Sequence, residues 1–464
     1  KAINLMSTYL NRSTLLDTQE ATALREQIRQ YFHQTADLYE SLFQTLVSDE
    51  AYYVNSIKLR HPLIFYYGHT NTFFINKLIL AGLITERVNP QFESMFAVGV
   101  DEMGWDDINA QNYNWPTPLE VKTYRASVRK VVDQLICTLP LNLPMDWENQ
   151  WWTILMGIEH ERIHLETSSV LIRQHALHYV QKKDTCRSCS AIDTAAPSNS
   201  LVDIPPRLIT LSKSPEHYGW DNEYGNFESE CTAFQAAKYL TSNAEFLAFV
   251  EADGYKDDSY WQEEGLAWRH YAEAMHPTFW VQQGDVWKLR LMTEEVAMPW
   301  SWPVEVNYHE AKAFCNWHSA NTGKQVRMPS EHEWYSLYAH AGLSDEKVRG
   351  SMNANLFLDH YASSCPVNTY AHGDLYDVVG NVWQWTETPI FPFDGFKVHP
   401  LYDDFSTPTF DGRHNIIKGG SWIASGNEAL KDARYAFRRH FFQHAGFRYI
   451  VTDTPLQIHA SHYE

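Results

Sequence analysis

Two histidines in one helix-like segment, His160 and His164, give this sequence a clear capacity for metal chemistry. They are four residues apart within Gly157–Glu166, and side chains four apart on a helix share one face, with about 5–6 Å between Cβ atoms. Two imidazoles placed in this way can bind one metal ion. The structural alternative is a pair of helical histidines whose ring nitrogens only form hydrogen bonds.

A third histidine, His69, lies in a second apolar segment with helical character. Its neighbours include Ile64, Phe65 and Phe73, so we expect its ring to face the interior or a cavity. Two facing helices that contribute one and two histidines to a bundle interior are a known way to build a metal site. Gly68, beside it, would allow two helices to approach closely. A lone histidine in such a place is otherwise a hydrogen-bonded core residue.

The ligand set leaves two kinds of metal chemistry open. The segment His160-Glu161-x-x-His164 matches the zinc-protease signature, in which Glu161 would be the general base of a hydrolase. Three neutral imidazoles without an anionic ligand also suit iron or another divalent metal that keeps several open positions. Those positions can take a thiolate and an oxygen ligand, which suits oxygen-dependent chemistry on a thiol substrate.

Four long helices are expected to position these histidines. Apolar residues recur at helical spacing over residues 17–48, 61–83, 118–138 and 147–181. The connections between them vary in length, which favours a four-helix bundle over residues 1–182. The long loop between the second and third helices carries the polar and aromatic residues Asp101, Glu102, Trp105, Asp106 and Asp107. Long ordered loops often serve function.

The second half of the sequence has a different pattern. Residues 183–205 are polar and resemble a linker. After Pro206, short aromatic and β-branched runs alternate with Gly, Asp, Asn and Pro turns, which predicts an irregular α+β domain over residues 206–464. Short helices are expected at 308–322 and 331–341. The predicted fold class is therefore an all-α domain followed by an α+β domain.

Composition narrows the classes of partner. The 37 Lys and Arg against 57 Asp and Glu give a net charge of −20, which disfavours nucleic acid and anionic membrane surfaces as partners. The most apolar stretch, 64–84, contains polar residues and is expected to be a buried helix rather than a membrane span. Six cysteines are too few for a disulfide framework, and Cys186 and Cys189 are interpreted as loop thiols. With no secretory signal at the start, a cytoplasmic protein is expected.

The motifs together resemble a known enzyme family. Tyr67–Thr70 and Glu159–Thr167 resemble the DinB-like four-helix bundle of the non-haem iron sulfoxide synthases. The second half resembles the formylglycine-generating-enzyme (sulfatase-modifying factor) fold, which is related to C-type lectins. The motifs that carry this second resemblance are Trp302–Val306, Ala311–Cys315, Arg327–Trp334, Leu375–Trp385, Lys418–Trp422 and Gly446–Arg448.

The resemblance implies a reaction and a cofactor. It implies that His69, His160 and His164 bind Fe(II) and that O2 is a co-substrate. The branch that this chain resembles joins the sulfur of L-cysteine to the imidazole ring of L-histidine and gives 5-histidylcysteine sulfoxide, in ovothiol biosynthesis. The stretches that distinguish this branch are Phe96–Met103, Tyr218–Gly225 and His399–Phe405.

Two alternatives stay open beside this reading of the family. One is an ergothioneine-type synthase that uses trimethylhistidine with cysteine or γ-glutamylcysteine, and the other is a metal-free module that only binds a ligand. The methyltransferase domain of many ovothiol enzymes is absent here, so that step is expected to belong to a missing segment or to a separate protein. The last cysteine is Cys365, which excludes the thiol chemistry of formylglycine-generating enzymes at the expected positions. The second domain is then expected to be a lid and substrate wall.

The resemblance also implies roles for residues of the second domain. Tyr402 is the expected catalytic tyrosine, which would donate a proton or hydrogen atom and disfavour simple thiol dioxygenation; the alternative is that it only packs. Arg434 and Arg438 are expected on one face of a strand, where a guanidinium can bind a substrate carboxylate, with a structural salt bridge as the alternative. Asp221 and Asn222 are expected to bind a substrate amine, unless they form a structural turn.

Overall fold

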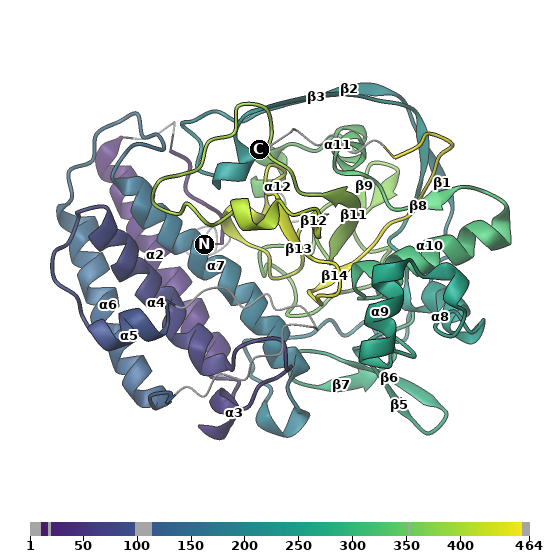
Figure 1. Ribbon diagram of the computed structural model, residues 1–464, viewed down its shortest axis with the longest axis horizontal. Helices are drawn as coiled ribbons and strands as arrows, with labels where there is room; N and C mark the ends of the chain where they lie inside the picture. The colour runs from purple at the N-terminus through teal and green to yellow at the C-terminus, as the bar shows by residue number, and fades with distance from the viewer. Residues whose placement is uncertain (1–10, 17–19, 98–113, 351–352, 457–464) are drawn as a thin grey trace, which may run out of the picture. The chain divides into compact units, whose positions relative to one another are not determined.

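The computed structural model describes residues 11–16, 20–97, 114–350 and 353–456 of the chain. The chain divides into two compact units (Figure 1). The first, called the helical unit below, contains residues 1–184, 214–218 and 292–294, and the mixed unit contains the remainder. The loop residues Asp101–Asp107 and most of the stretch Phe96–Met103 lie outside the described residues, so the expectations for them stay predictions.

Four long helices form the bundle that the sequence predicts for the helical unit. They are α2 (Ala21–Phe43), α4 (Leu63–Leu80), α6 (Pro118–Thr138) and α7 (Trp151–Gln174), drawn in purple to blue in Figure 1. Both α6 and α7 pack against α2 and α4, so the four helices close around one core. The connections contain the short helices α3 (Glu50–Tyr53) and α5 (Pro90–Met95).

Two of these helices end earlier than the periodicity predicts. The helices expected to reach residues 48 and 181 end at Phe43 and Gln174. The residues that follow pair with each other instead, through a bridge between Leu46 and Val180 and a hydrogen bond from the Gln181 amide to the Thr45 carbonyl oxygen at 2.8 Å. This antiparallel contact between distant segments satisfies backbone groups that the helices would otherwise have satisfied.

Helix α7 is buried on almost every side. Its buried residues run from Trp151 to Arg173 and include charged side chains. Tyr31 OH donates to Glu159 Oε1 at 2.8 Å, and Arg162 Nε donates to Thr35 Oγ1 at 2.8 Å. Because charged groups are rarely buried without partners, these bonds to α2 stabilise a helix that is buried along most of its surface.

Two four-stranded sheets frame the mixed unit. The first has the order β1 (Leu201–Ile204), β4 (Phe234–Ala237), β15 (Ile450–Val451) and β8 (Val326–Arg327), and every neighbouring pair is antiparallel. The second has the order β13 (Tyr435–Arg438), β12 (His414–Lys418), β11 (Trp383–Pro389) and β14 (Ala445–Gly446), in which only the β11–β14 pair is parallel. The first sheet therefore pairs strands that are more than 200 residues apart in the chain, with Ile450 opposite Ala236.

The other strands of the mixed unit form small antiparallel ribbons, and its helices are short. The ribbons are β2 (Arg207–Ser212) with β3 (Asn226–Cys231), β5 (Trp280–Gln283) with β6 (Val286–Arg290) and β7 (Glu295–Ala297), and β9 (Ala371–His372) with β10 (Leu375–Tyr376). The helices are α8 (Asn243–Glu251), α9 (Glu263–Ala272), α10 (Tyr308–Thr322), α11 (Glu331–His340) and α12 (Asp345–Gly350). The predicted α+β character is confirmed, and α10 and α11 match the helices expected at 308–322 and 331–341.

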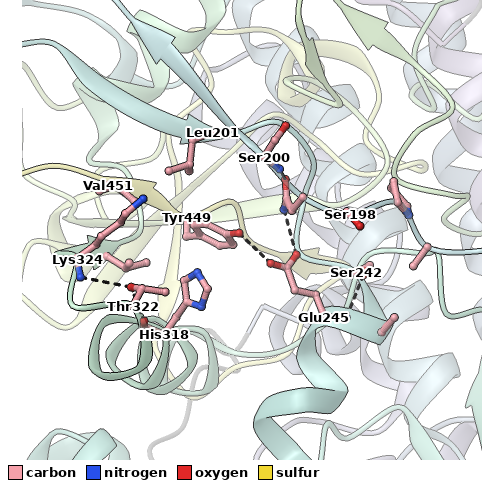
Figure 2. A pocket seen from close by; sticks show the side chains of 15 residues that line it. Ser198, Ser200, Leu201, Ser242, Glu245, His318, Thr322, Lys324, Tyr449 and Val451 are labelled. Carbon is pink, nitrogen blue, oxygen red and sulfur yellow. Dashed lines mark hydrogen bonds between the residues drawn. The ribbon is translucent and has the colours of Figure 1, made fainter.

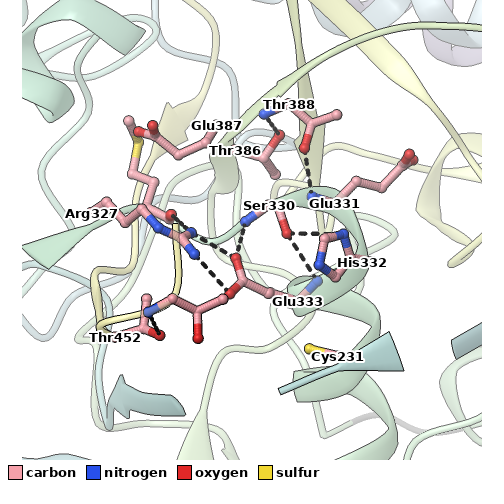
Figure 3. Close-up of polar contacts among 12 residues, drawn as sticks. Cys231, Arg327, Ser330, Glu331, His332, Glu333, Thr386, Glu387, Thr388 and Thr452 are labelled. Carbon is pink, nitrogen blue, oxygen red and sulfur yellow. Dashed lines mark hydrogen bonds and ion pairs between the residues drawn. The ribbon is translucent and has the colours of Figure 1, made fainter. Parts of the chain in front are cut away.

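The Arg327–Trp334 motif forms the start of helix α11. Ser330 Oγ accepts a hydrogen bond from the Glu333 amide at 3.3 Å, and Glu333 Oε1 accepts one from the Ser330 amide at 2.8 Å (Figure 3). Arg327 Nη1 and Nη2 donate to the two oxygens of Glu333 at 2.7 and 3.0 Å. This capping box joins β8 to α11, and its polar residues stabilise the fold.

The prediction that residues 183–205 form a linker is partly wrong. The last residues of this segment form strand β1, which pairs with β4 from Leu201 opposite Ala237 to Ile204 opposite Phe234. Earlier in the segment, Trp302 Nε1 donates to the Ala191 carbonyl oxygen at 2.9 Å. The polar composition of the segment did not indicate these backbone contacts, because their partners lie elsewhere in the mixed unit. Within the described residues, no helix is both long enough and apolar enough to cross a membrane.

Candidate metal centre and substrate residues

Three histidines of the helical unit converge on one point. His69 comes from α4, and His160 and His164 come from α7. One nitrogen of each ring lies within 4.8 Å of the others, and the ring centroids are 5.0, 4.8 and 4.6 Å apart. The predicted pairing of two histidines from one helix with one from a facing helix is therefore present, and the three rings could hold one metal ion.

Neighbouring groups fix the orientation of two of the rings. The Nδ1 atom of His69 lies 2.6 Å from the Phe96 carbonyl oxygen, so Nδ1 carries the proton and Nε2 is the nitrogen that can bind a metal. Phe73 stacks on the His160 ring at 3.7 Å between centroids and 8° between planes. Phe65 stacks on the His69 ring at 5.0 Å. Aromatic contacts thus reduce ring rotation before any metal binds.

The electrostatics of the cluster favour neutral imidazoles. His160 is 2% exposed, and burial together with the neighbouring rings of His164 and His69 holds its pKa well below the usual value. A neutral imidazole is the form that coordinates a metal. The group that surrounds this point contains no Asp or Glu among the residues that the structure describes. A bound dication would therefore keep its full charge for an anionic ligand such as a thiolate.

Glu161, the expected general base of the hydrolase alternative, has other partners. Its Oε2 atom accepts from Asn71 Nδ2 at 3.3 Å and from Arg125 Nη2 at 3.4 Å. Arg125 is itself buried and also donates to Glu40 Oε1 at 2.6 Å and Thr70 Oγ1 at 2.9 Å. The Glu161 carboxylate therefore belongs to an ion-pair network between helices, which weighs against its use as a base.

Two glycines permit the close packing around the centre. A Cβ atom on Gly157 would lie 2.1 Å from the Phe74 ring, so this glycine allows α4 and α7 to approach. A Cβ atom on Gly68 would lie 2.6 Å from the Phe96 ring. Gly68 was predicted to allow two helices to approach closely. In the structure it makes room for the side chain of Phe96, whose carbonyl oxygen orients His69.

Tyr402 lies in an aromatic cluster of the mixed unit. Its ring centroid is 6.1 Å from that of Trp220 and 5.2 Å from that of Phe405. Ser406, in the same loop, donates a short hydrogen bond to Asp221 Oδ1. The loop with Tyr402 and the turn with Asp221 are therefore adjacent, as both substrate-site predictions require, although their catalytic and binding roles stay predictions.

Asp221 and Asn222 belong to a buried turn, the 3-10 helix Asp221–Glu223. Asp221 is 3% exposed, and burial raises the pKa of its carboxyl to about 6. Asn222 Nδ2 donates to the Arg434 carbonyl oxygen at 3.3 Å, and Arg434 Nη1 donates to the Asn222 carbonyl oxygen at 2.7 Å. These reciprocal bonds show that the structural turn, the alternative stated above, is present.

Arg434 and Arg438 differ from the expected arrangement on one strand. Arg434 precedes β13, which begins at Tyr435 and ends at Arg438. Arg434 Nε and Nη2 donate to the two carboxylate oxygens of Glu331 at 2.9 and 3.1 Å, and Nη2 also donates to the Phe391 carbonyl oxygen. These contacts favour the structural ion pair over carboxylate binding at Arg434. Arg438 is half-buried at the end of the strand, and its role stays a prediction.

Sequence reasoning missed the residues that orient the histidines. Phe73 was named only as an apolar neighbour of His69. Because it is four residues after His69 and shares its helix face, its contact with the histidine cluster could have been predicted. Phe96 contributes a backbone carbonyl, and no residue type signals such a contact. Arg125 lies in an amphipathic helix in which arginine is ordinary on the exposed side, so only the packing shows that it is buried.

Comparisons with known proteins agree with this two-unit arrangement. The family model of the sulfatase-modifying factor enzyme 1-like domain matches residues 195–453, and the model of the DinB superfamily matches residues 31–168. Hercynine oxygenase of Mycolicibacterium smegmatis is 26% identical over 387 residues, which are 76% of this chain and 84% of that protein. Ergothioneine biosynthesis protein 1 of Neurospora crassa is 22% identical and covers 84% of this chain and 54% of its own length. Formylglycine-generating enzyme of Thermomonospora curvata is 27% identical over 49% of this chain.

Proposed function

Because the chain belongs to the family of the sulfatase-modifying factor enzyme 1-like domain and carries a DinB-superfamily bundle before that domain, we propose that it is an iron- and oxygen-dependent sulfoxide synthase. In this reaction the sulfur of L-cysteine is joined to the imidazole ring of L-histidine, giving 5-histidylcysteine sulfoxide in ovothiol biosynthesis. Relatives named as an oxygenase and as an ergothioneine biosynthesis protein support an oxidative, biosynthetic enzyme.

The observation that carries the proposal is the convergence of His69, His160 and His164 on one point without a carboxylate in the group. Neutral imidazoles suit iron among other metals, and three of them leave several coordination positions open. When bound, ferrous iron would supply those positions to a thiolate and to dioxygen, together with the redox chemistry that oxidises sulfur. Phe96 and Phe73 fix two of the rings, and among the described residues no Asp or Glu joins the ligand group to compete with the thiolate.

The proposed reaction balances without another reductant. One C–S bond forms while the S–H bond of cysteine and one C–H bond of the imidazole break. One oxygen atom of O2 is incorporated as the sulfoxide oxygen, and the other leaves as water with the two hydrogens. The four electrons that O2 accepts come from the two substrates, so neither a nicotinamide nor oxoglutarate is needed.

Residues of the mixed unit are proposed to serve the same reaction. Tyr402 would donate a proton or hydrogen atom, and Asp221 and Asn222 would bind a substrate amine. Arg438 would bind a carboxylate. Arg434 was expected in the same role. Its bidentate bonds to Glu331 hold its guanidinium in place, and its Nη1 atom donates to the Asn222 carbonyl oxygen, which supports a positioning role.

A second candidate reaction uses trimethylhistidine in place of histidine. The relatives favour it, because the first is named for hercynine and another for ergothioneine. The partner thiol would then be cysteine or γ-glutamylcysteine. The stretches Tyr218–Gly225 and His399–Phe405 favour histidine. The Trp220 ring of the first stretch stacks on the Phe405 ring of the second, with 4.1 Å between centroids.

The decisive experiment is anaerobic reconstitution of the full chain with Fe(II), followed by L-cysteine, O2 and either L-histidine or trimethylhistidine in competition. We expect a product whose mass equals the two substrates plus O2 minus water, with histidine preferred. Preference for trimethylhistidine would select the ergothioneine-type reaction. The absence of any coupled product with either L-histidine or trimethylhistidine would overturn the proposal, and an intact fold without stoichiometric metal would favour a ligand-binding module.

The role of Tyr402 is tested by the products of Tyr402→Phe. Loss of the hydroxyl should lower the fraction of coupled sulfoxide and raise the fraction of cysteine sulfinic acid, at unchanged iron content. Tyr361→Phe, in the same unit, is the matched control and should leave this ratio unaltered. An unchanged ratio in Tyr402→Phe would show that Tyr402 only packs against Trp220.

A further inference from the structure

A polar cavity lies within the mixed unit. Its volume is about 530 Å³. It is bordered by residues before and in β1, the first turn of α8, the last turns of α10, and strands β8 and β15 (Figure 2). The polar residues that matter below are Asn199, Glu245, His318, Lys324 and Tyr449. None of them belongs to the histidine cluster or to the predicted substrate residues.

Glu245 is the anionic group of this cavity. Its Oε1 atom accepts from Asn199 Nδ2 at 3.0 Å, and its Oε2 atom accepts from Tyr449 OH at 2.9 Å. Both donors are neutral, and among the described residues no Lys or Arg forms an ion pair with this carboxylate. Burial raises the pKa of this carboxyl, and the hydrogen bonds from Asn199 and Tyr449 oppose the shift. Each oxygen keeps lone pairs that could accept from a cationic ligand.

Lys324 provides a positive charge elsewhere on the wall of the same cavity. Figure 2 shows Lys324 and Glu245 on opposite sides of Tyr449 and His318. The His318 ring lies 5.0 Å from the Tyr449 ring and 5.8 Å from the Phe314 ring, so aromatic contacts hold the wall between the two charges. Burial lowers the pKa of His318, and the neighbouring Lys324 lowers it further, so this imidazole is neutral near pH 7.

We propose that this cavity binds a small zwitterion of tripeptide size, with its ammonium group at Glu245 and its carboxylate at Lys324. Cavities of about 300–1,000 Å³ hold ligands of this size class. A purely apolar ligand would remove water from the half-buried Glu245 carboxylate and offer it no new donor, which is costly for a charged group. A polyanion would meet one lysine and be repelled by Glu245. Opposite charges at two ends of one wall match a molecule that carries opposite charges at its two ends.

The probe for this site is triglycine, whose only charges are its two ends. Isothermal titration of the full chain, without added iron, measures binding independently of any catalytic activity. N-acetyl-triglycine lacks the ammonium and triglycine amide lacks the carboxylate. We expect each blocked peptide to bind at least ten-fold more weakly than triglycine. Equal binding of all three peptides, or no binding of triglycine, would overturn the proposal.

Variants locate the site and separate binding from folding. Glu245→Gln keeps the size of the side chain and one acceptor oxygen but removes the charge. It should weaken triglycine binding at least ten-fold while the affinity of the N-acetylated peptide stays the same. Lys324→Met should also weaken triglycine binding at least ten-fold, while the affinity of triglycine amide stays the same. Glu251→Gln, an exposed glutamate of the same helix α8, is the matched control. Unchanged triglycine affinity in both cavity variants, at unchanged melting temperature, would contradict the assignment.

Discussion

The histidine cluster of the helical unit and the ion pairs of the mixed unit differ in how their buried polar side chains are paired. In the helical unit, three imidazoles meet at one point and no carboxylate joins them among the described residues. In the mixed unit, Arg434 forms an ion pair with Glu331, and Lys213 Nζ lies 2.9 Å from Glu223 Oε1. The first arrangement leaves ring nitrogens directed at a shared point, whereas the second pairs each charge with an opposite one.

This difference indicates which polar side chains are available to bind a ligand. A side chain whose donors are all bonded within the protein stabilises the fold, because removing its partner would leave a buried charge. Neutral imidazoles that converge without a carboxylate stabilise each other little, whereas a bound metal cation would interact favourably with all of them. The histidines are therefore the stronger functional assignment, and Arg434 is the weaker one, although the sequence suggested both.

The largest effect should come from His160→Ala. Loss of one of three ligands should lower iron affinity and coupled-product formation by at least 100-fold, because the two remaining rings cannot replace its nitrogen. Metal content by elemental analysis and product by mass spectrometry measure the two effects. His178→Ala, an exposed histidine after α7, should change neither. Stoichiometric iron in His160→Ala would contradict the centre.

The next effect should be on stability, through Arg434→Met. This change leaves the Glu331 carboxylate buried without its bidentate partner, and we expect the free energy of unfolding to fall by about 3–5 kcal/mol. Denaturant unfolding measures it, and iron content should stay the same. Lys256→Met, which breaks an exposed pair with Asp253, should have little effect. A stable Arg434→Met with a raised KM for one amino acid would instead support direct substrate binding.

A smaller effect is expected from Gly157→Ala, which tests how closely α4 and α7 must approach. Its new methyl group would overlap the Phe74 ring, so we expect a loss of about 1–3 kcal/mol in the free energy of unfolding. Because the helices carry the ligands, iron affinity should fall as well. Gly350→Ala, where no atom lies within 4 Å of the new group, is the control. Unchanged iron affinity would show that the ligands tolerate movement of the helices.

The smallest effect concerns the pH dependence of stability at Asp221. Its pKa is raised from 3.8 to about 6 in the folded protein, so the folded state binds the proton more tightly and stability falls as pH rises from about 4 to 6. Asp221→Asn should remove up to about 2 kcal/mol of this fall. Denaturant unfolding at several pH values measures it, with exposed Asp285→Asn as the control. Parallel profiles for wild type and Asp221→Asn would contradict the raised pKa.

Much of the helical unit was predictable because its information is local. Apolar residues at helical spacing indicate α4 and α6 within a few residues, and the four-residue spacing places His160 and His164 on one face. The ends of α2 and α7 were not predictable, because residues 45 and 181 pair across more than 130 positions. Strand β1 was missed for the same reason, since its partner β4 lies outside the segment.

The sequence by itself determined which residues could bind a metal and that the chain consists of two different domains. Only the tertiary structure decided that His69 meets the other two histidines, that Phe96 orients its ring, and that Glu161 and Arg434 are held in ion pairs. Helix spacing follows from backbone geometry, which the local sequence fixes. The partner of a buried charge, by contrast, depends on which distant segments pack together, and that depends on the whole chain.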